Sequence, residues 1–381
     1  MTVPVSRHSG RGCLLPAILG SLVALALLCG LGYYALGINL AFISGAIRGV
    51  LAPPPSASDI TVPEGVVVQV WASGLDSPTS LTFGPDGRLY VAELTGNVAA
   101  LADRDDDHAA EERTVFAAGL ASPLGLAFYE SDLFVGRRGG VTRLRDTDGD
   151  GVADEARSIV EGLPALRHQT DSIAIGPDGR LYIGQGSTSD RGETGVQPLE
   201  ASILVAERDG NGLRVFASGT RNPYDLAFFP GTSQLFATDN GRDVPPSGVP
   251  DELNLIVEGG DYGWPGCWGK GQGPDCAGTL PSVAEFQEHA STNGLVFYTG
   301  DLFPLWRDNA FVCLYGSNSG DPGIGKVIQR VELTQAADGS WQGEVFDFAS
   351  GFNRPLDITV GPDGALYVSD FGSGVIYRLG Q

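Results

Sequence analysis

Short segments in which apolar and polar residues alternate run along the chain from about residue 65 to the C-terminus. In a clear example, residues 80–83 lead into the tetrapeptide GPDG, and residues 88–91 follow it. Alternation of period two predicts a strand with one buried face. Proline presets φ in the tetrapeptide and glycine tolerates φ above zero, so the tetrapeptide predicts a tight turn. No helical period separates these strands.

This strand–turn–strand unit is repeated. Copies open at Gly74, Gly119, Gly162, Gly219 and Gly351, and a degenerate copy follows His289. Units of roughly 40–60 residues with several short strands each indicate a β-propeller, and six units fit the chain. We expect the strand that begins at Gly65 to pair with residues 375–379 and close the ring. A β-sandwich would not account for the repeated Gly-x-x-x-Pro opening.

The first 58 residues have a different character. Their only ionised side chains are Arg7, Arg11 and Arg48, and the uncharged stretch between Arg11 and Arg48 is long enough to span a bilayer. It exceeds the apolar core of a secretory signal, although cleavage near Ala52 stays open. The two early arginines predict a cytoplasmic N-terminus. The expected organisation is a cytoplasmic tip and transmembrane anchor (1–51), a Pro-rich linker (52–60) and an all-β, six-bladed propeller (61–381) outside the cytoplasmic membrane.

The amino-acid composition excludes a disordered chain and disfavours a nucleic-acid-binding protein. The chain has 55 glycines in 381 residues, a net charge of −22 and a pI near 4.4. A hydrophobic fraction of 42% with 18% charged residues excludes a disordered chain. The acidic balance disfavours binding to nucleic-acid phosphates. The glycine surplus fits a chain with many turns.

The predicted location outside the cytoplasm is an oxidising compartment, in which cysteines can form disulfides. Cys267 and Cys276 flank a short Gly-rich loop, and a disulfide is the preferred interpretation. A zinc site is weaker, because no Cys-x-x-Cys or nearby His accompanies them. Cys313 lies in an apolar run and is expected to be a buried thiol.

Polar residues stand out in the turns that open several repeats. They are His168-Gln169, Arg221-Asn222, Asn240-Gly241-Arg242 and Arg354. Equivalent turns of a propeller converge on one face, so these side chains are expected to meet. An imidazole beside guanidinium groups suits proton abstraction, with arginine stabilising negative charge. The alternative is a hydrogen-bonded loop histidine and arginines paired with the abundant acids.

Longer motifs surround these turns. They are His168-Gln169 before IAIGPDGRLYIGQG, GTRNPYDLAF from Gly219, DELN from Asp251, GDYGWP from Gly260, and Asn353-Arg354 before DITVGPDGALYVSD. In these motifs the chain resembles the family of glucose/sorbosone dehydrogenases that depend on pyrroloquinoline quinone (PQQ), which are six-bladed propellers. The resemblance covers roughly residues 61–381.

The resemblance implies a set of roles. His168 would remove the substrate hydroxyl proton as hydride passes to PQQ, with Arg221 as a second catalytic residue. Cofactor contacts would come from Gln169, Arg221, Asn222, Asn240 and Arg354. Backbone carbonyls of Gly241 and Arg242 would bind Ca²⁺. Two departures from the family pattern are Arg167, where relatives have an acid, and the loop after Tyr315, which lacks the family's cation.

Two further groups of residues each have two possible interpretations. Asp146, Asp148, Asp150 and Asp154 match part of an EF-hand loop without its final Glu or its helices. They form either a structural calcium loop or a solvated acidic turn. Trp264 and Trp268 form either a sugar-stacking wall or packing under a turn.

These observations favour a membrane-anchored quinoprotein that oxidises a sugar, related polyol or aldehyde. It would pass electrons to a membrane acceptor, a quinone or a cytochrome. One rival is a non-catalytic propeller that binds a carbohydrate or a protein. A calcium-dependent lactonase is the other, and it is disfavoured because that class needs carboxylates on the channel axis.

Overall fold

The computed structural model describes residues 56–243, 248–317, 321 and 323–381. Strands dominate this part of the chain, and its only helical segments are two single 3₁₀ turns, η1 (Ala57–Asp59) and η2 (Pro304–Trp306). The strands form six antiparallel sheets of four. The predicted anchor, residues 1–51, lies outside the described residues. Within the described ranges, no helix is long and apolar enough to cross a membrane.

Each sheet is one blade, named here in chain order. Blade 1 contains β2 (Pro78–Phe83), β3 (Leu89–Glu93), β4 (Asn97–Ala102) and β5 (Glu112–Ala117). Blade 2 contains β6 (Pro123–Tyr129), β7 (Asp132–Arg137), β8 (Gly140–Arg145) and β9 (Glu155–Glu161). Blade 3 contains β10 (Thr170–Ile175), β11 (Leu181–Gln185), β12 (Ser202–Ala206) and β13 (Arg214–Ser218).

The second half of the ring repeats this order. Blade 4 contains β14 (Pro223–Phe228), β15 (Leu235–Asp239), β16 (Asp251–Ile256) and β17 (Ala284–Phe286). Blade 5 contains β18 (Thr292–Phe297), β19 (Ala310–Leu314), β20 (Val327–Gln335) and β21 (Trp341–Ser350). Blade 6 contains β22 (Pro355–Val360), β23 (Leu366–Asp370), β24 (Val375–Gly380) and β1 (Val67–Ala72).

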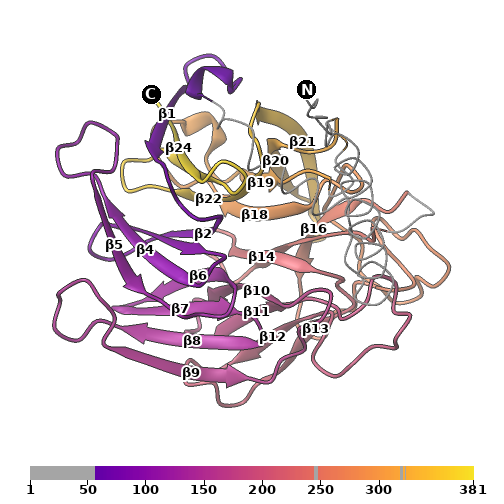
Figure 1. The fold of residues 1–381 in the computed structure, drawn as a ribbon. Helices are drawn as coiled ribbons and strands as arrows, with labels where there is room; N and C mark the ends of the chain where they lie inside the picture. Colours follow the sequence, from indigo (N-terminus) through magenta and orange to yellow (C-terminus); the bar gives the residue numbers. More distant parts are fainter. Residues whose placement is uncertain (1–55, 244–247, 318–320, 322) are drawn as a thin grey trace, which may run out of the picture. The chain divides into compact units, whose positions relative to one another are not determined.

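The first strands of the blades form the inner ring. β2, β6, β10, β14, β18 and β22 each contact the next in this order, and β22 contacts β2 again. Figure 1 shows these six labels gathered around the centre. The predicted six-bladed propeller is therefore confirmed.

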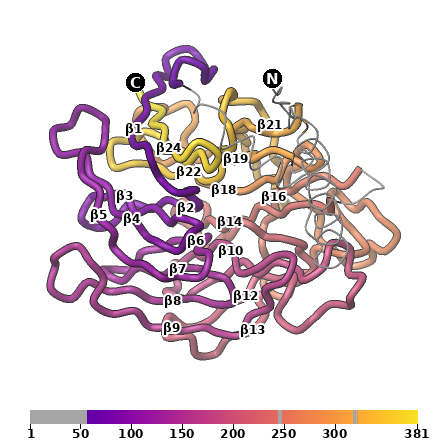
Figure 2. Tube along the Cα trace, viewed as in Figure 1, coloured from indigo at the N-terminus to yellow at the C-terminus, as the bar shows by residue number. Residues whose placement is uncertain are grey.

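The ring closes where the two ends of the propeller meet. β1 pairs with β24 along a register that includes Val68 opposite Leu379, and Figure 2 shows the indigo and yellow segments side by side. The predicted closure is confirmed. Ile60, expected in the linker, is buried in the core beside blade 6, and Thr61 bridges to Ser350. Ile60 thus packs with the propeller.

The turns that open the blades have a shared backbone requirement. Gly74, Gly119, Gly162, Gly219 and Gly351 all have positive φ, between 74° and 100°. Residues with a side chain rarely adopt this backbone conformation, so the turn explains why glycine is repeated at this position.

Buried carboxylates join neighbouring blades near the inner ring. Asp225 Oδ2 accepts a hydrogen bond of 2.6 Å from the Leu295 amide in blade 5. Asp357 Oδ2 accepts one of 2.7 Å from the Leu81 amide, which joins blade 6 to blade 1. Apolar clusters fill the space between sheets. Blades 4 and 5, and blades 6 and 1, are therefore joined by hydrogen bonds as well as by apolar packing.

The cysteine predictions are also confirmed. Cys267 and Cys276 form a disulfide. Cys313 is a buried free thiol in β19.

Candidate functional site

The polar turn residues lie at one end of the blades. His168 and Gln169 precede β10, Arg221 and Asn222 precede β14, and Arg354 precedes β22. The segment from Asn240 to Arg242 follows β15, a second strand. In an antiparallel blade, the turn before the first strand and the loop after the second lie at the same end. We call this end the channel face.

His168 is the candidate base. Its Nε2 atom is buried and has no hydrogen-bond partner among the described residues. Burial lowers the pKa of His168 well below its usual range, and the charges of Arg221 and Arg167 lower the pKa further. The imidazole is therefore neutral at pH 7, and Nε2 can accept a proton.

A glycine makes room for this histidine. A Cβ atom on Gly186 would lie 2.4 Å from His168 Cβ and 2.5 Å from Asn222 Oδ1. Both distances are shorter than real contacts, so only glycine fits between the two side chains. Gly186 thus brings the candidate base and a predicted cofactor residue together.

Arg221 is bound more tightly than the sequence suggested. Its guanidinium is 3% exposed and donates to Asp190 Oδ1 at 2.6 Å, to the Asn240 carbonyl at 3.0 Å and to Asp243 Oδ2 at 3.1 Å. Nε donates to the Asp190 carbonyl at 3.3 Å. The alternative weighed from the sequence, an arginine paired with acids, is the arrangement in the structure.

Two acidic residues that the sequence analysis did not single out complete this network. Asp190 is 2% exposed, and its Oδ1 also accepts the Asp243 amide at 3.0 Å. Asp243 Oδ2 also accepts a 2.7 Å hydrogen bond from Arg167, the neighbour of His168. Burial opposes ionisation of Asp190, but Arg221 and these hydrogen bonds keep its pKa below the usual value. Two arginines and two carboxylates therefore balance in charge beside His168.

Arg354 has a different environment. It donates to the Tyr315 hydroxyl at 2.6 Å and stacks over the Tyr315 ring. Among the described residues, no carboxylate lies within ion-pair distance of it. This guanidinium keeps its positive charge available to an anion. Gln169, by contrast, donates to the Ser122 carbonyl at 3.1 Å and ties two turns together.

Several buried polar atoms on the channel face lack a partner. They include Asn222 Oδ1, Asn240 Oδ1 and Thr220 Oγ1. The other end of the Asn240 side chain is fixed, because its Nδ2 donates to Asn293 Oδ1 at 3.1 Å. Buried polar groups normally have partners, so these atoms are candidates for contacts to a polar ligand.

Buried carboxylates lie under the turns and on the inner strands. Burial, with Glu252 beside it, raises the pKa of Asp239 to about 8, although its oxygens accept the Arg221 and Asn222 amides. Burial raises the pKa of Glu252 to about 7. Asp171, in β10, has an unpartnered Oδ2 and a pKa raised by burial and by Asp239. The inner strand β10 thus carries a buried carboxylate in addition to the His and Arg of the turns.

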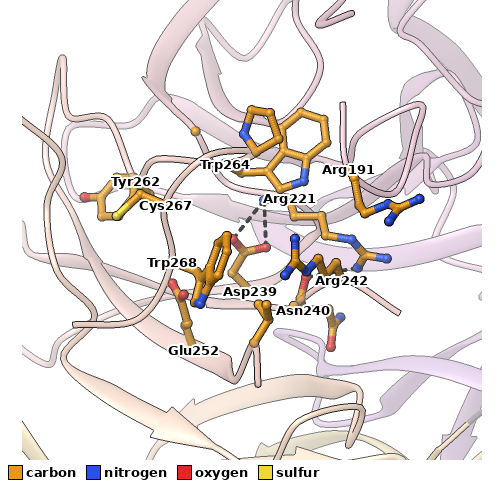
Figure 3. A pocket seen from close by; sticks show the side chains of 14 residues that line it. Arg191, Arg221, Asp239, Asn240, Arg242, Glu252, Tyr262, Trp264, Cys267 and Trp268 are labelled. Carbon is orange, nitrogen blue, oxygen red and sulfur yellow. Dashed lines mark hydrogen bonds between the residues drawn. The ribbon is translucent and has the colours of Figure 1, made fainter. Parts of the chain in front are cut away.

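A small pocket adjoins this network, beneath the disulfide loop. Its volume is about 20 Å³, enough for one water-sized occupant. Figure 3 shows Arg221, Asp239, Trp264 and Trp268 around it. Trp264 Nε1 donates to the Asp190 carbonyl at 3.2 Å, and Arg242 stacks on Trp268. Both tryptophans thus pack against polar groups of the site, and the sugar-stacking role stays a prediction.

The predicted metal residues fall into two places. The Gly241 amide donates to Asp251 Oδ1 at 2.8 Å, and the calcium role of the Gly241 and Arg242 carbonyls stays a prediction. In the acidic loop of blade 2, oxygens of Asp146, Asp148 and Asp154 lie within 4.8 Å of one another.

Asp150 does not belong to that group. Its Oδ1 accepts the Val152 amide at 2.8 Å. A second such acidic group, which the sequence analysis did not identify, contains Asp103, Asp105, Asp107 and Glu111.

Comparison with known proteins agrees with the propeller fold. A putative oxidoreductase (glucose dehydrogenase) from Thermus thermophilus is 28% identical, with a TM-score of 0.65 over 83% of this chain and 100% of that one. The holo pyranose dehydrogenase PQQ domain from Coprinopsis cinerea has a TM-score of 0.73 over 84% and 97% of the two chains. At 17% identity it shows the fold alone.

A sequence relative points the same way. Quinoprotein glucose dehydrogenase B from Acinetobacter calcoaceticus is 26% identical over 260 residues, about half of each chain. The expected resemblance to quinoprotein sugar dehydrogenases is therefore confirmed. A family model described as "Domain of unknown function (DUF7133)" matches residues 52–242. On that match, the chain belongs to the DUF7133 family.

Proposed function

We propose that the protein is a PQQ-dependent dehydrogenase that oxidises a sugar or a related polyol or aldehyde. The observation that carries the proposal is His168: a neutral imidazole whose buried Nε2 has no partner, on the face where the polar turns meet. The names of the relatives, glucose dehydrogenase and quinoprotein glucose dehydrogenase B, supply the reaction class.

The residues present fit an anionic quinone at several points. Arg354 offers a guanidinium with no carboxylate partner among the described residues. Asn222 and Asn240 each present an unpartnered buried oxygen. Arg221 fits less directly, because its charge is already balanced by Asp190 and Asp243. When bound, PQQ with Ca²⁺ would supply the hydride acceptor.

The roles of the chain's own residues follow from their positions. His168 Nε2 accepts the proton of the substrate hydroxyl, and burial keeps the imidazole ready for it. Gly186 holds His168 and Asn222 at close approach. Arg354 attracts a cofactor carboxylate, and the carbonyls of Gly241 and Arg242 would hold Ca²⁺. The carboxylate group of Asp146, Asp148 and Asp154 would hold a second, structural Ca²⁺.

The location is part of the proposal. The long uncharged stretch between Arg11 and Arg48 would anchor the protein in the cell membrane, with the propeller outside the cytoplasm. Electrons would then pass to a membrane quinone or cytochrome. Labelling with an impermeant reagent would test this topology: a propeller protected in intact cells contradicts it.

Reconstitution tests the activity. Purified protein is mixed with PQQ and Ca²⁺, and reduction of a dye is followed with a set of aldoses. We expect turnover in the wild type and a loss of at least about 100-fold in His168→Ala, the usual scale for a general base. Binding of PQQ without turnover of any substrate would favour a non-catalytic propeller. Hydrolysis of a lactone by protein without PQQ would favour the lactonase.

A further inference from the structure

The starting observation is a single oxygen atom held by two arginines. Asp243 Oδ2 accepts hydrogen bonds from Arg167 Nη2 at 2.7 Å and from Arg221 Nη2 at 3.1 Å. Among the described residues, the carboxylate of Asp243 has no other hydrogen-bond donor. Guanidinium groups that converge in this way are a typical binding arrangement for a carboxylate.

The two acids of the network are held very differently. Asp190 is 2% exposed, pairs with Arg221 at 2.6 Å and also accepts a backbone amide. Removing it would leave a buried guanidinium without its main counter-charge. The Asp243 side chain is 43% exposed, and among the described residues its carboxylate is held by the two guanidinium groups alone, while its backbone amide donates to Asp190 Oδ1 at 3.0 Å. Asp190 is thus a fixed part of the site, whereas Asp243 can be displaced at small cost.

The position lies next to the candidate base. Arg167 is the chain neighbour of His168, and Arg221 is the neighbour of Asn222, whose Oδ1 lies near His168 across Gly186. A carboxylate bound where Asp243 Oδ2 lies would therefore be close to the group that removes the proton. With Asp243 in place, the two positive charges of Arg167 and Arg221 are balanced by the two negative charges of Asp190 and Asp243.

We propose that Arg167 and Arg221 form a carboxylate-binding position that the protein's own Asp243 fills, and that a carboxylate of the cofactor takes this position by displacing Asp243. This inference rests on the proposed function. Asp243 then acts as an internal competitor that sets cofactor affinity. The displacement of Asp243 would also explain how Arg221, whose charge is already balanced by two carboxylates, can take its predicted role in binding the cofactor.

Competition fixes the direction of the effect. A ligand that binds only when Asp243 has moved away has an apparent affinity reduced by the fraction of time the position is open. Two ion pairs to a half-exposed carboxylate keep that fraction at about one tenth. Removing the charge in Asp243→Asn should therefore tighten PQQ binding about tenfold. Arg167→Gln should weaken it, because one of the two donors is lost.

The experiment measures dissociation constants for PQQ in the presence of Ca²⁺, from quenching of tryptophan fluorescence. Asp301→Asn is the matched control, because it removes one acid paired with an arginine, in the loop between β18 and β19 at the opposite end of blade 5. We expect tighter binding in Asp243→Asn, weaker binding in Arg167→Gln and no change in Asp301→Asn. Unchanged or weaker binding in Asp243→Asn overturns the proposal.

A second probe separates this proposal from the proposed function. Pyridine-2,6-dicarboxylate, a small aromatic dicarboxylate, is titrated into the same variants by calorimetry. If no variant binds PQQ but Asp243→Asn binds the dicarboxylate more tightly than the wild type does, the PQQ function fails and the carboxylate position stands. If the dicarboxylate also shows no gain, the position is wrong. Should Asp243→Asn misfold, Asp243→Ser and Arg167→Gln give the same two comparisons.

Discussion

The buried ion pair between Arg221 and Asp190 offers a direct test of how the site is held together. The perturbation is Asp190→Asn, which keeps the shape of the side chain and removes its charge. Arg221 Nη2 and Asp190 Oδ1 are 2.6 Å apart, and the two side chains are 3% and 2% exposed. The substitution leaves a guanidinium that is 3% exposed, and among the described residues Asp243, at 3.1 Å, is then its one ion-pair partner.

The magnitude follows from burial. Removing one partner of a buried pair typically costs 3–5 kcal/mol, and the remaining Asp243 offsets part of it, so we expect a loss of about 3 kcal/mol in the free energy of unfolding. The matched control is Glu258→Gln. Glu258 pairs with Arg214 at the same 2.6 Å, but the side chains are 57% and 46% exposed. An exposed pair contributes about 0–1 kcal/mol, so the control should be nearly neutral.

Urea unfolding followed by tryptophan fluorescence measures both variants, with midpoints compared at constant slope. A double variant, Asp190→Leu with Arg221→Met, should be less destabilised than Asp190→Asn, because it removes both charges together. The reasoning is refuted if Asp190→Asn and Glu258→Gln cost the same. It is also refuted if the double variant is worse than the single one.

Three further predictions concern His168, Gly186 and Asp171. Because burial and two arginines lower the pKa of His168 below 6.5, the acid limb of kcat/KM should lie below pH 6.5; a limb at or above 6.5 in a pH–rate profile would contradict this. Gly186→Ala places a Cβ atom 2.4 Å from His168 Cβ, so it should lower the free energy of unfolding by about 1–3 kcal/mol and remove most of the activity. Gly266→Ala is the control: the nearest contact of its Cβ atom is 3.2 Å, so urea unfolding and dye reduction should both change little. Burial raises the pKa of Asp171, so the folded state retains a proton that the unfolded state loses above about pH 3.8. The free energy of unfolding should therefore fall as the pH rises from there through the raised pKa. Measured at several pH values, it should fall less steeply in Asp171→Asn than in the wild type.

The blades could be predicted from the sequence because their signals are local. Alternation of period two, the GPDG turns and the opening glycines each act within a few residues, and the positive φ of Gly74 and its equivalents confirms the turn chemistry. The closing pair of β1 and β24 could also be anticipated, because a ring of repeats leaves one strand at each end to be joined. The disulfide followed from two cysteines that flank one short loop.

The environment of the site residues could not be predicted in this way. Asp190 and Asp243 come from loops of blades 3 and 4, and nothing local marks them among 46 acidic residues. Only the packed structure brings them to Arg221 and balances its charge. The carboxylates of the inner strands were missed for a similar reason, since Asp171 and Asp225 look like ordinary polar positions of a strand until the ring encloses them.

By itself, then, the sequence determined the repeat, the turns, the closure of the ring and the residue types that face the channel, because short-range periodicity and backbone restrictions decide these. The tertiary structure decided which of those residues keep an open hydrogen-bonding position and which are already satisfied. His168 has an unpartnered Nε2, whereas Arg221 is held by two acids. Charge balance and burial depend on every loop that meets at a point, and those loops are far apart along the chain.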